Sequence, residues 1–223
     1  MERQEIIEQV QKQKIIAILR GLNPDSCLET AKALQRGGIQ LMEVTFDPRD
    51  MQKQQDTIKS IQMIREYFGQ EVLVGAGTVV SPRLVQMAAQ AGACYIISPD
   101  TDREVIEKTR QLRMVSMPGA LTPTEISNAQ KWGADFVKLF PAGNFGPEFI
   151  EAIKAPLSHV RLLAVGGVHA GNAAEFLKAG CCGLGAGGNL VNKKWIQAGE
   201  YEKLTEAARE LVTAVQSIQA QSC

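Results

Sequence analysis

The chain has 223 residues, of which 45% are hydrophobic and 22% charged, a composition typical of a globular protein that can bury a sizeable core. Its 24 Lys and Arg residues balance its 24 Asp and Glu residues, so the net charge gives no reason to expect nucleic acid or an anionic membrane as a partner. Five cysteines without a CxxC motif and only two histidines argue against a disulfide framework and against a zinc site, and we expect no metal.

The first residues predict a helix and not a targeting segment. Residues 1–14, MERQEIIEQVQKQK, are amphipathic and charged, without the apolar stretch of a secretory signal. No apolar run of about 18 residues follows, so we expect no membrane-spanning helix. Together with the cysteine usage, this pattern predicts a protein of the reducing cytoplasm.

Short apolar runs alternate with helical patterns along the rest of the chain. The helical stretches, such as residues 24–38 and 81–93, end near glycines, which commonly terminate helices. This alternation predicts strands that pair in parallel. The predicted strands are residues 15–21, 41–46, 72–79, 95–99, 114–119, 136–142, 162–168 and 183–187.

Eight such units in a chain of this length predict a single-domain (β/α)8 TIM barrel over residues 1–223, preceded by an N-terminal helix. A doubly wound open sheet is the alternative. Its usual nucleotide-binding motif, GxGxxG, does not follow the first predicted strand. In a barrel, the chemically active groups lie at the C-terminal ends of the strands, and we look for them there.

Two ionisable residues, Glu43 and Lys138, interrupt otherwise apolar strands. Side-chain alternation places Lys138 on the same strand face as Phe136 and Phe140. One interpretation is a buried salt bridge, which at best breaks even energetically. The other is catalysis, because burial frees a lysine amine to attack a ketone while a nearby carboxylate moves protons. The second and sixth strands lie opposite each other across a narrow barrel, and we favour catalysis.

Two glycine pairs follow the last two predicted strands, Gly166-Gly167 and Gly187-Gly188. Barrels often bind phosphate in these two loops, through backbone N–H groups and a helix N-terminus. Glycine lets an anion approach the backbone closely. The alternative is that these glycines only serve tight turns.

Six segments, in chain order, resemble the 2-keto-3-deoxy-6-phosphogluconate/4-hydroxy-2-oxoglutarate aldolase family: IIAILRG, MEVTF, VGAGTV, MPGALTPTEI, FVKLFPA and VGGV. The resemblance as a whole covers the chain from residue 14 to about residue 190. The resemblance implies a homotrimer of (β/α)8 barrels and a class I aldolase that needs no metal or organic cofactor. Such enzymes cleave 2-keto-3-deoxy sugar acids to pyruvate and an aldehyde.

The resemblance also implies roles for individual residues. Lys138 corresponds to the Schiff-base lysine, Glu43 to the general acid/base, and Thr78 to a contact with the pyruvyl end of the substrate. Gly166 and Gly167 lie where the family holds the substrate phosphate. The full set expected to bind substrate is Arg20, Thr78, Pro118, Phe140, Gly166, Gly167, Gly187 and Gly188.

The chain departs from the phosphogluconate-cleaving branch of that family at two motifs. Asp47 stands where that branch has an arginine for the substrate carboxylate, so Arg20 becomes the leading cation for this group and Arg49 a weaker candidate. Residues 164–167 read AVGG in place of PTGG. Both changes resemble the 2-dehydro-3-deoxy-6-phosphogalactonate branch, which differs at C4 of the substrate.

A third departure concerns the phosphate. The family's glycine-serine after the last strand is here Gly187-Gly188, so one hydroxyl donor is missing, and Asn189 or backbone amides are left to replace it. The expected function is cleavage of a 2-keto-3-deoxy-6-phospho sugar acid to pyruvate and glyceraldehyde 3-phosphate. The alternatives are 4-hydroxy-2-oxoglutarate cleavage to pyruvate and glyoxylate, and a barrel that binds or isomerises a sugar phosphate without aldolase activity.

Overall fold

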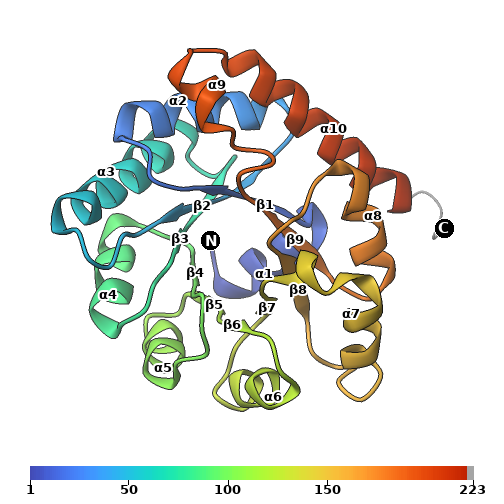
Figure 1. Ribbon diagram of the computed structural model, residues 1–223. Helices are drawn as coiled ribbons and strands as arrows, with labels where there is room; N and C mark the ends of the chain where they lie inside the picture. Colours follow the sequence, from blue (N-terminus) through green and yellow to red (C-terminus); the bar gives the residue numbers. More distant parts are fainter. Residues whose placement is uncertain (220–223) are drawn as a thin grey trace.

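The computed structural model describes residues 1–219, which form one parallel barrel surrounded by helices (Figure 1). The described residues contain nine strands, and every predicted strand is present but shorter, mostly at its C-terminal end. The strands are β1 (Ile15–Leu19), β2 (Leu41–Thr45), β3 (Leu73–Gly77), β4 (Tyr95–Ile97), β5 (Val115–Met117), β6 (Gly119–Ala120), β7 (Val137–Leu139), β8 (Leu162–Val165) and β9 (Gly183–Ala186).

Helices follow the strands and cover the outside of the barrel, as the alternating pattern predicted. They are α1 (Arg3–Gln13), α2 (Pro24–Arg36), α3 (Met51–Phe68), α4 (Pro82–Ala91), α5 (Arg103–Gln111), α6 (Pro123–Lys131), α7 (Gly146–Lys154), α8 (Ala170–Lys178), α9 (Lys193–Gln197) and α10 (Tyr201–Gln219), with a 3₁₀ turn, η1, at Ala142–Asn144. Between residues 1 and 219, no helix has both the length and the apolar character needed to cross a membrane.

The fifth predicted strand, residues 114–119, is divided into β5 and β6 by Pro118. The strand order is β5-β4-β3-β2-β1-β9-β8-β7-β6, so β5 pairs with β4 whereas β6 pairs with β7. Proline has no N–H to donate to a ladder, but the carbonyl of Pro118 accepts the N–H of Lys138 at 2.8 Å. β5 and β6 are the two ends of the strand order, and Pro118 joins them along the chain, so the sheet forms a barrel. The predicted eight-unit barrel is confirmed, with the fifth strand divided into two.

Side chains on the strands alternate between two hydrophobic clusters. On β7, Val137 and Leu139 pack outward among the helices, whereas Phe136 points into the barrel. This is the two-residue alternation expected for a strand that is buried on both faces. The interior cluster contributed by the strands consists of Ile16, Ile18, Leu41, Leu73, Tyr95, Ile97, Val115, Met117, Phe136, Leu163 and Val165.

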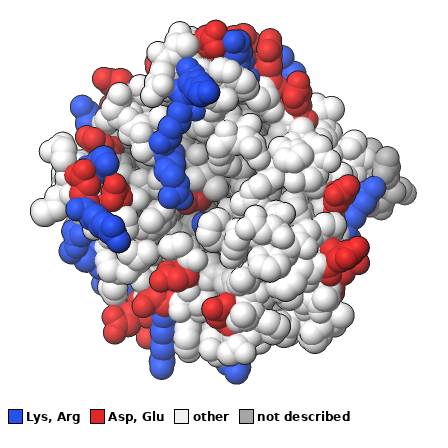
Figure 2. Space-filling model, viewed as in Figure 1, with Lys and Arg blue, Asp and Glu red and all other residues white. Residues whose placement is uncertain are grey.

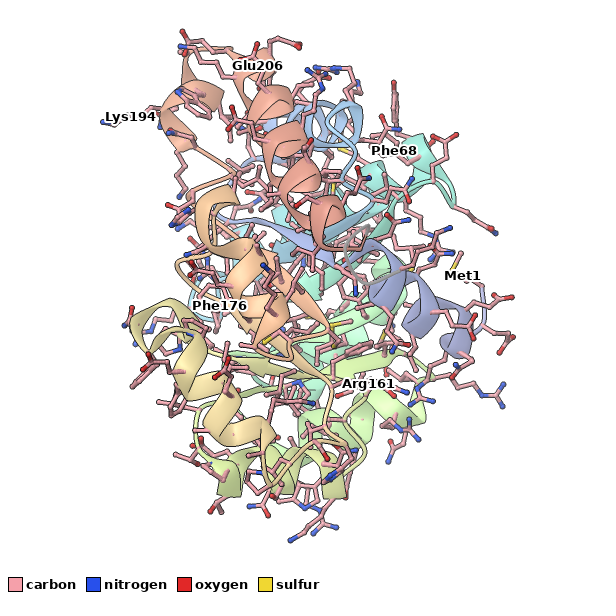
Figure 3. The ribbon with its side chains drawn as sticks, turned by 90° about the vertical axis from the view of Figure 1, so that its right-hand side faces the viewer. Met1, Phe68, Arg161, Phe176, Lys194 and Glu206 are labelled. Atoms are coloured by element: carbon pink, nitrogen blue, oxygen red, sulfur yellow. The ribbon has the colours of Figure 1, made fainter. Side chains whose placement is uncertain are left out.

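The predicted N-terminal helix, α1, closes the bottom of the barrel. Its residues Ile6, Ile7 and Val10 belong to the interior cluster, and Arg3 forms an ion pair with Asp135, just before β7. Figure 3 shows Met1 and α1 on the side of the molecule opposite to Lys194, which lies on the face of the strand C-termini. The barrel thus has a sealed end and an open end, and the predicted site residues lie toward the open end.

Candidate active site

Lys138 lies on the interior face of β7 and is 4% exposed. Its Nζ is 5.1 Å from the centroid of the Phe140 ring, two residues along the same face. Phe140 is 41% exposed at the barrel mouth, so its ring lies between the lysine and solvent. The predicted alternation of Phe136, Lys138 and Phe140 is confirmed. The face that they share is enclosed at Phe136 and Lys138 and reaches solvent at Phe140.

Glu43 lies on β2 and is 1% exposed. Its carboxylate extends over Gly77 of β3, where a Cβ would overlap the Oε1 atom. The absence of a side chain at Gly77 therefore leaves the space that the Glu43 carboxylate occupies. The Oε1 atom is buried and has no hydrogen-bond partner in the described part of the chain. An unsatisfied buried carboxylate oxygen is costly, and this atom is free to bind a water or a substrate hydroxyl.

Burial shifts the pKa values of both groups toward their neutral forms. It raises the pKa of Glu43, and the positive charges of Lys138 and Arg20 oppose that rise. It lowers the pKa of Lys138, with Glu43 opposing the fall and Arg20 adding to it. The structure thus brings Glu43, Lys138 and Arg20 into electrostatic contact although they come from different strands. A less protonated amine and a carboxyl group that can carry a proton are the properties that imine chemistry needs.

Beneath this pair, the interior is filled by Tyr95 from β4, which sequence analysis did not single out. Its ring packs where a Cβ on Gly75 would lie, and its hydroxyl donates to the Met42 and Leu73 carbonyls at 2.7 and 3.2 Å. Gly75 and Gly77 lie two residues apart and so share one face of β3. Two glycines at this spacing were the feature of the sequence that could have indicated bulky side chains packed against this face. The glycines make room for a phenol ring below and a carboxylate above.

A cavity of about 580 Å³ opens at the C-terminal ends of β1, β2 and β3. Arg20, Thr78 and Lys193 line it, and Figure 2 shows the mouth as a hollow with basic side chains along its upper rim. Thr78 follows β3 directly and has a φ of 56°, in the left-handed region that β-branched residues strongly disfavour. The cavity is therefore lined by two of the predicted binding residues, one of them in a strained conformation, whereas Glu43 and Lys138 are buried and do not line it.

The two glycine pairs differ in what surrounds them. Gly166 and Gly167 have φ values of 93° and 76°, and the Gly166 carbonyl accepts the N–H of Gly143 at 2.8 Å. A Cβ on Gly167 would lie 3.2 Å from the Cα of Gly143, so backbone packing requires this pair. At Gly187 the nearest neighbour of a Cβ would be Ile18 at 4.0 Å, and Gly188 has nothing within 4 Å. The second pair borders open space.

The cations and donors considered for substrate anions have distinct positions. Asp47 accepts from Lys53 at 3.3 Å and from the Arg49 backbone N–H at 3.2 Å. Arg49 is exposed and does not line the mouth cavity, whereas Arg20 does. Asn189 donates its side-chain amide to the Val168 carbonyl at 3.2 Å, which ties the loops after β8 and β9 together. The geometry favours Arg20 over Arg49 as the cation of the site.

No group of three or more His, Cys, Asp or Glu side chains within residues 1–219 is arranged to hold a metal ion. The four cysteines in that range, Cys27, Cys94, Cys181 and Cys182, are free thiols, and Cys223 lies outside the described residues. Burial raises the pKa of the adjacent thiols Cys181 and Cys182 to about 12 and about 11, as expected for inert, hydrophobic cysteines.

The chain is similar to known aldolases. A 2-dehydro-3-deoxy-6-phosphogalactonate aldolase of Escherichia coli K12 is 37% identical over 180 residues, 80% of this chain and 85% of that protein. A KHG/KDPG aldolase of the same organism is 31% identical over 183 residues, 82% of this chain and 83% of that protein.

Two solved structures extend the comparison. A native KDPGal structure is 34% identical and superposes with a TM-score of 0.83, covering 92% of this chain and 96% of that one. A KDPG aldolase from Legionella pneumophila, solved with pyruvate captured as a covalent carbinolamine, is 26% identical with a TM-score of 0.80 and covers 89% of this chain and 94% of that one. The family model for KDPG and KHG aldolase matches residues 6–207. This chain belongs to the KDPG and KHG aldolase family.

Proposed function

We propose that this protein is a class I aldolase that cleaves a 2-keto-3-deoxy-6-phospho sugar acid to pyruvate and glyceraldehyde 3-phosphate. The observation that carries the proposal is the pair of buried ionisable side chains, Lys138 and Glu43, which face one enclosed interior below an open mouth. The names of the relatives support the same reaction class.

The first step is imine formation. The unprotonated amine of Lys138 attacks the C2 ketone of the substrate, and loss of water from the carbinolamine gives an iminium linkage. Burial lowers the pKa of Lys138, which increases the fraction of amine that can attack. In this proposal Arg20 binds the C1 carboxylate and Thr78 contacts the pyruvyl end, since both line the cavity at the strand ends. Pro118 borders the lysine, because its carbonyl accepts the Lys138 N–H.

The second step is cleavage of the C3–C4 bond. Glu43, directly or through a water, removes the proton of the C4 hydroxyl, and the bonding electrons move to the iminium to form an enamine. The aldehyde then leaves. The same carboxyl group returns the proton to C3 to make the methyl group, and water hydrolyses the imine to release pyruvate. Glu43 fits both transfers because burial raises its pKa and its Oε1 lacks a protein partner.

Trapping tests the proposal. Pyruvate and borohydride should add a reduced pyruvyl group to Lys138, detected by mass spectrometry of the digested protein. A barrel that only binds or isomerises a sugar phosphate gives no adduct. An adduct on a different lysine would show that Lys138 is not the residue that forms the imine.

The C4 epimer is the next question. The residues AVGG at 164–167 and Asp47 in place of arginine, together with the 37% identical relative, favour the phosphogalactonate substrate. Cleavage of the gluconate and galactonate epimers, measured side by side, tests this choice. Because one relative is named a KHG/KDPG aldolase, the same assay should include 4-hydroxy-2-oxoglutarate, for which glyoxylate is the second product. Preference for that unphosphorylated substrate would overturn the phosphate assignment.

We further propose that the protein is a cytoplasmic homotrimer, as the family resemblance implies. Light scattering on the protein as it elutes from a size-exclusion column measures its mass in solution directly. A mass of one or two chains would contradict the trimer.

A further inference from the structure

Lys193, the first residue of α9, reaches the loop that follows β1, the strand next to β9. Its Nζ lies 3.2 Å from the point that a Cβ on Gly21 would occupy. Gly21 directly follows Arg20, and both cations line the mouth cavity. Figure 2 shows basic side chains running from the region of α9 toward the central hollow. Sequence analysis gave no role to this lysine.

Arg20 interacts electrostatically with Glu43, whereas no acidic side chain pairs with Lys193 in the described part of the chain. The third cation of the cavity, Lys53, is 3.3 Å from the Asp47 carboxylate. Asp56 also lines the cavity. Arg20 already faces Glu43 and the proposed position of the C1 carboxylate, so Lys193 is the cation available for a second anionic group.

The loop between β9 and α9 carries the glycine pair with open space beside it, and Lys193 begins the helix that follows. Gly187 lies next to Ile18 of β1, and Gly188 has no neighbour where a side chain would be. The N–H groups of Leu190 and Val191 both bond the Gly187 carbonyl at 2.8 Å, which turns the chain back toward α9. Gly187 thus lies beside β1 at Ile18, and the Lys193 ammonium lies beside Gly21, just beyond the end of the same strand. This is the region where the family resemblance leads us to expect a serine hydroxyl that the sequence lacks.

We propose that Lys193 binds the phosphate at the far end of the substrate, in place of the missing hydroxyl. This inference rests on the proposed aldolase function. The lysine is a specificity-determining residue: it distinguishes phosphorylated from unphosphorylated aldehydes and acts little on the pyruvyl end. The charges that shift the pKa values of Lys138 and Glu43 come from each other and from Arg20, and Lys193 is not among them.

The test is the Lys193→Met variant, which keeps the length of the side chain and removes its charge. In aldol addition to pyruvate, its KM for glyceraldehyde 3-phosphate should rise about tenfold, the usual effect of one charge-assisted hydrogen bond. The KM values for unphosphorylated glyceraldehyde and for glyoxylate, whose carboxylate adjoins the reacting carbon, should stay within about twofold. Lys193→Arg should recover most of the affinity, because it restores a cation.

Lys194→Met is the matched control. Lys194 neighbours Lys193 on the same short helix, and Figure 3 shows its side chain pointing away from the molecule. Its loss should leave all three KM values unchanged. An equal rise for the three aldehydes in Lys193→Met, or an equal effect of the control, would overturn the proposal. If the parent protein forms no pyruvate adduct with borohydride, the aldolase function itself fails, which is a separate result.

Discussion

The lower and upper halves of the barrel interior are built from the same alternating strand positions but hold different chemistry. In the lower half, Phe136, Tyr95 and the residues of α1 fill the space with apolar groups. In the upper half, Lys138 and Glu43 take the next inward positions on β7 and β2. A rigid, dry lower layer excludes water from beneath the pair, so that burial can shift both pKa values. The lower layer provides stability and the upper layer provides reactivity.

Replacing Lys138 tests the reactive half most severely. Lys138→Ala should reduce cleavage and pyruvate trapping to background, while the free energy of unfolding should change little. A desolvated amine is removed from the interior, and Glu43, whose pKa burial raises, can take up a proton once the lysine is gone. Activity assays, mass spectrometry and denaturant unfolding measure the three quantities.

The matched control is Lys154→Ala. The Lys154 ammonium donates to the Ser158 and Val160 carbonyls at 2.7 and 2.8 Å, well away from the mouth. This variant should lose stability and keep its pyruvate adduct. If Lys138→Ala also lost most of its free energy of unfolding, the lysine would have a structural role, like the residues of the lower layer.

Glu43→Gln keeps the shape of the side chain and removes the base. Turnover should fall by about two to four orders of magnitude, the usual contribution of general acid–base catalysis. Exchange of the pyruvate methyl protons into D2O reports the step at C3 and should slow in parallel. Near-parental exchange would show that another group moves this proton.

Phe136→Ala probes the lower half on the same strand face, two residues from the lysine. Phe136 is 1% exposed, and its truncation should cost about 3–5 kcal/mol of unfolding free energy, as for other buried phenylalanines. Phe145→Ala, at a residue that is 46% exposed, should change the unfolding free energy by only about 0.5 kcal/mol. A folded, fully active Phe136→Ala protein with parental stability would remove the distinction between the layers.

The smallest effect concerns pH. The negative charge of Glu43 raises the pKa of Lys138, while burial and Arg20 lower it. Glu43→Gln removes only the raising influence, so the midpoint for amine trapping should move to lower pH. The rate of adduct formation with pyruvate and cyanoborohydride across pH measures it. A midpoint displaced to higher pH in the variant would mean that the two side chains do not interact as the structure indicates.

The order of strands and helices was predictable because glycines and apolar runs mark each unit locally. The division of the fifth strand at Pro118 was not, since the apolar run continues through it and only the change of partner from β4 to β7 exposes the break. Lys138 and Glu43 were conspicuous as charges in apolar strands. Lys193 was not, because a lysine at the start of a helix is ordinary until the fold places it beside Gly21.

The glycine beneath the Glu43 carboxylate has a consequence for how this chain can vary. Because a Cβ at residue 77 would overlap Oε1, residues 43 and 77 share one volume although they belong to different strands. A larger residue at 77 is tolerated only if the side chain at 43 shrinks or turns away. Among related sequences, these two alignment columns should therefore change together, and the glycine should be lost wherever the carboxylate is lost.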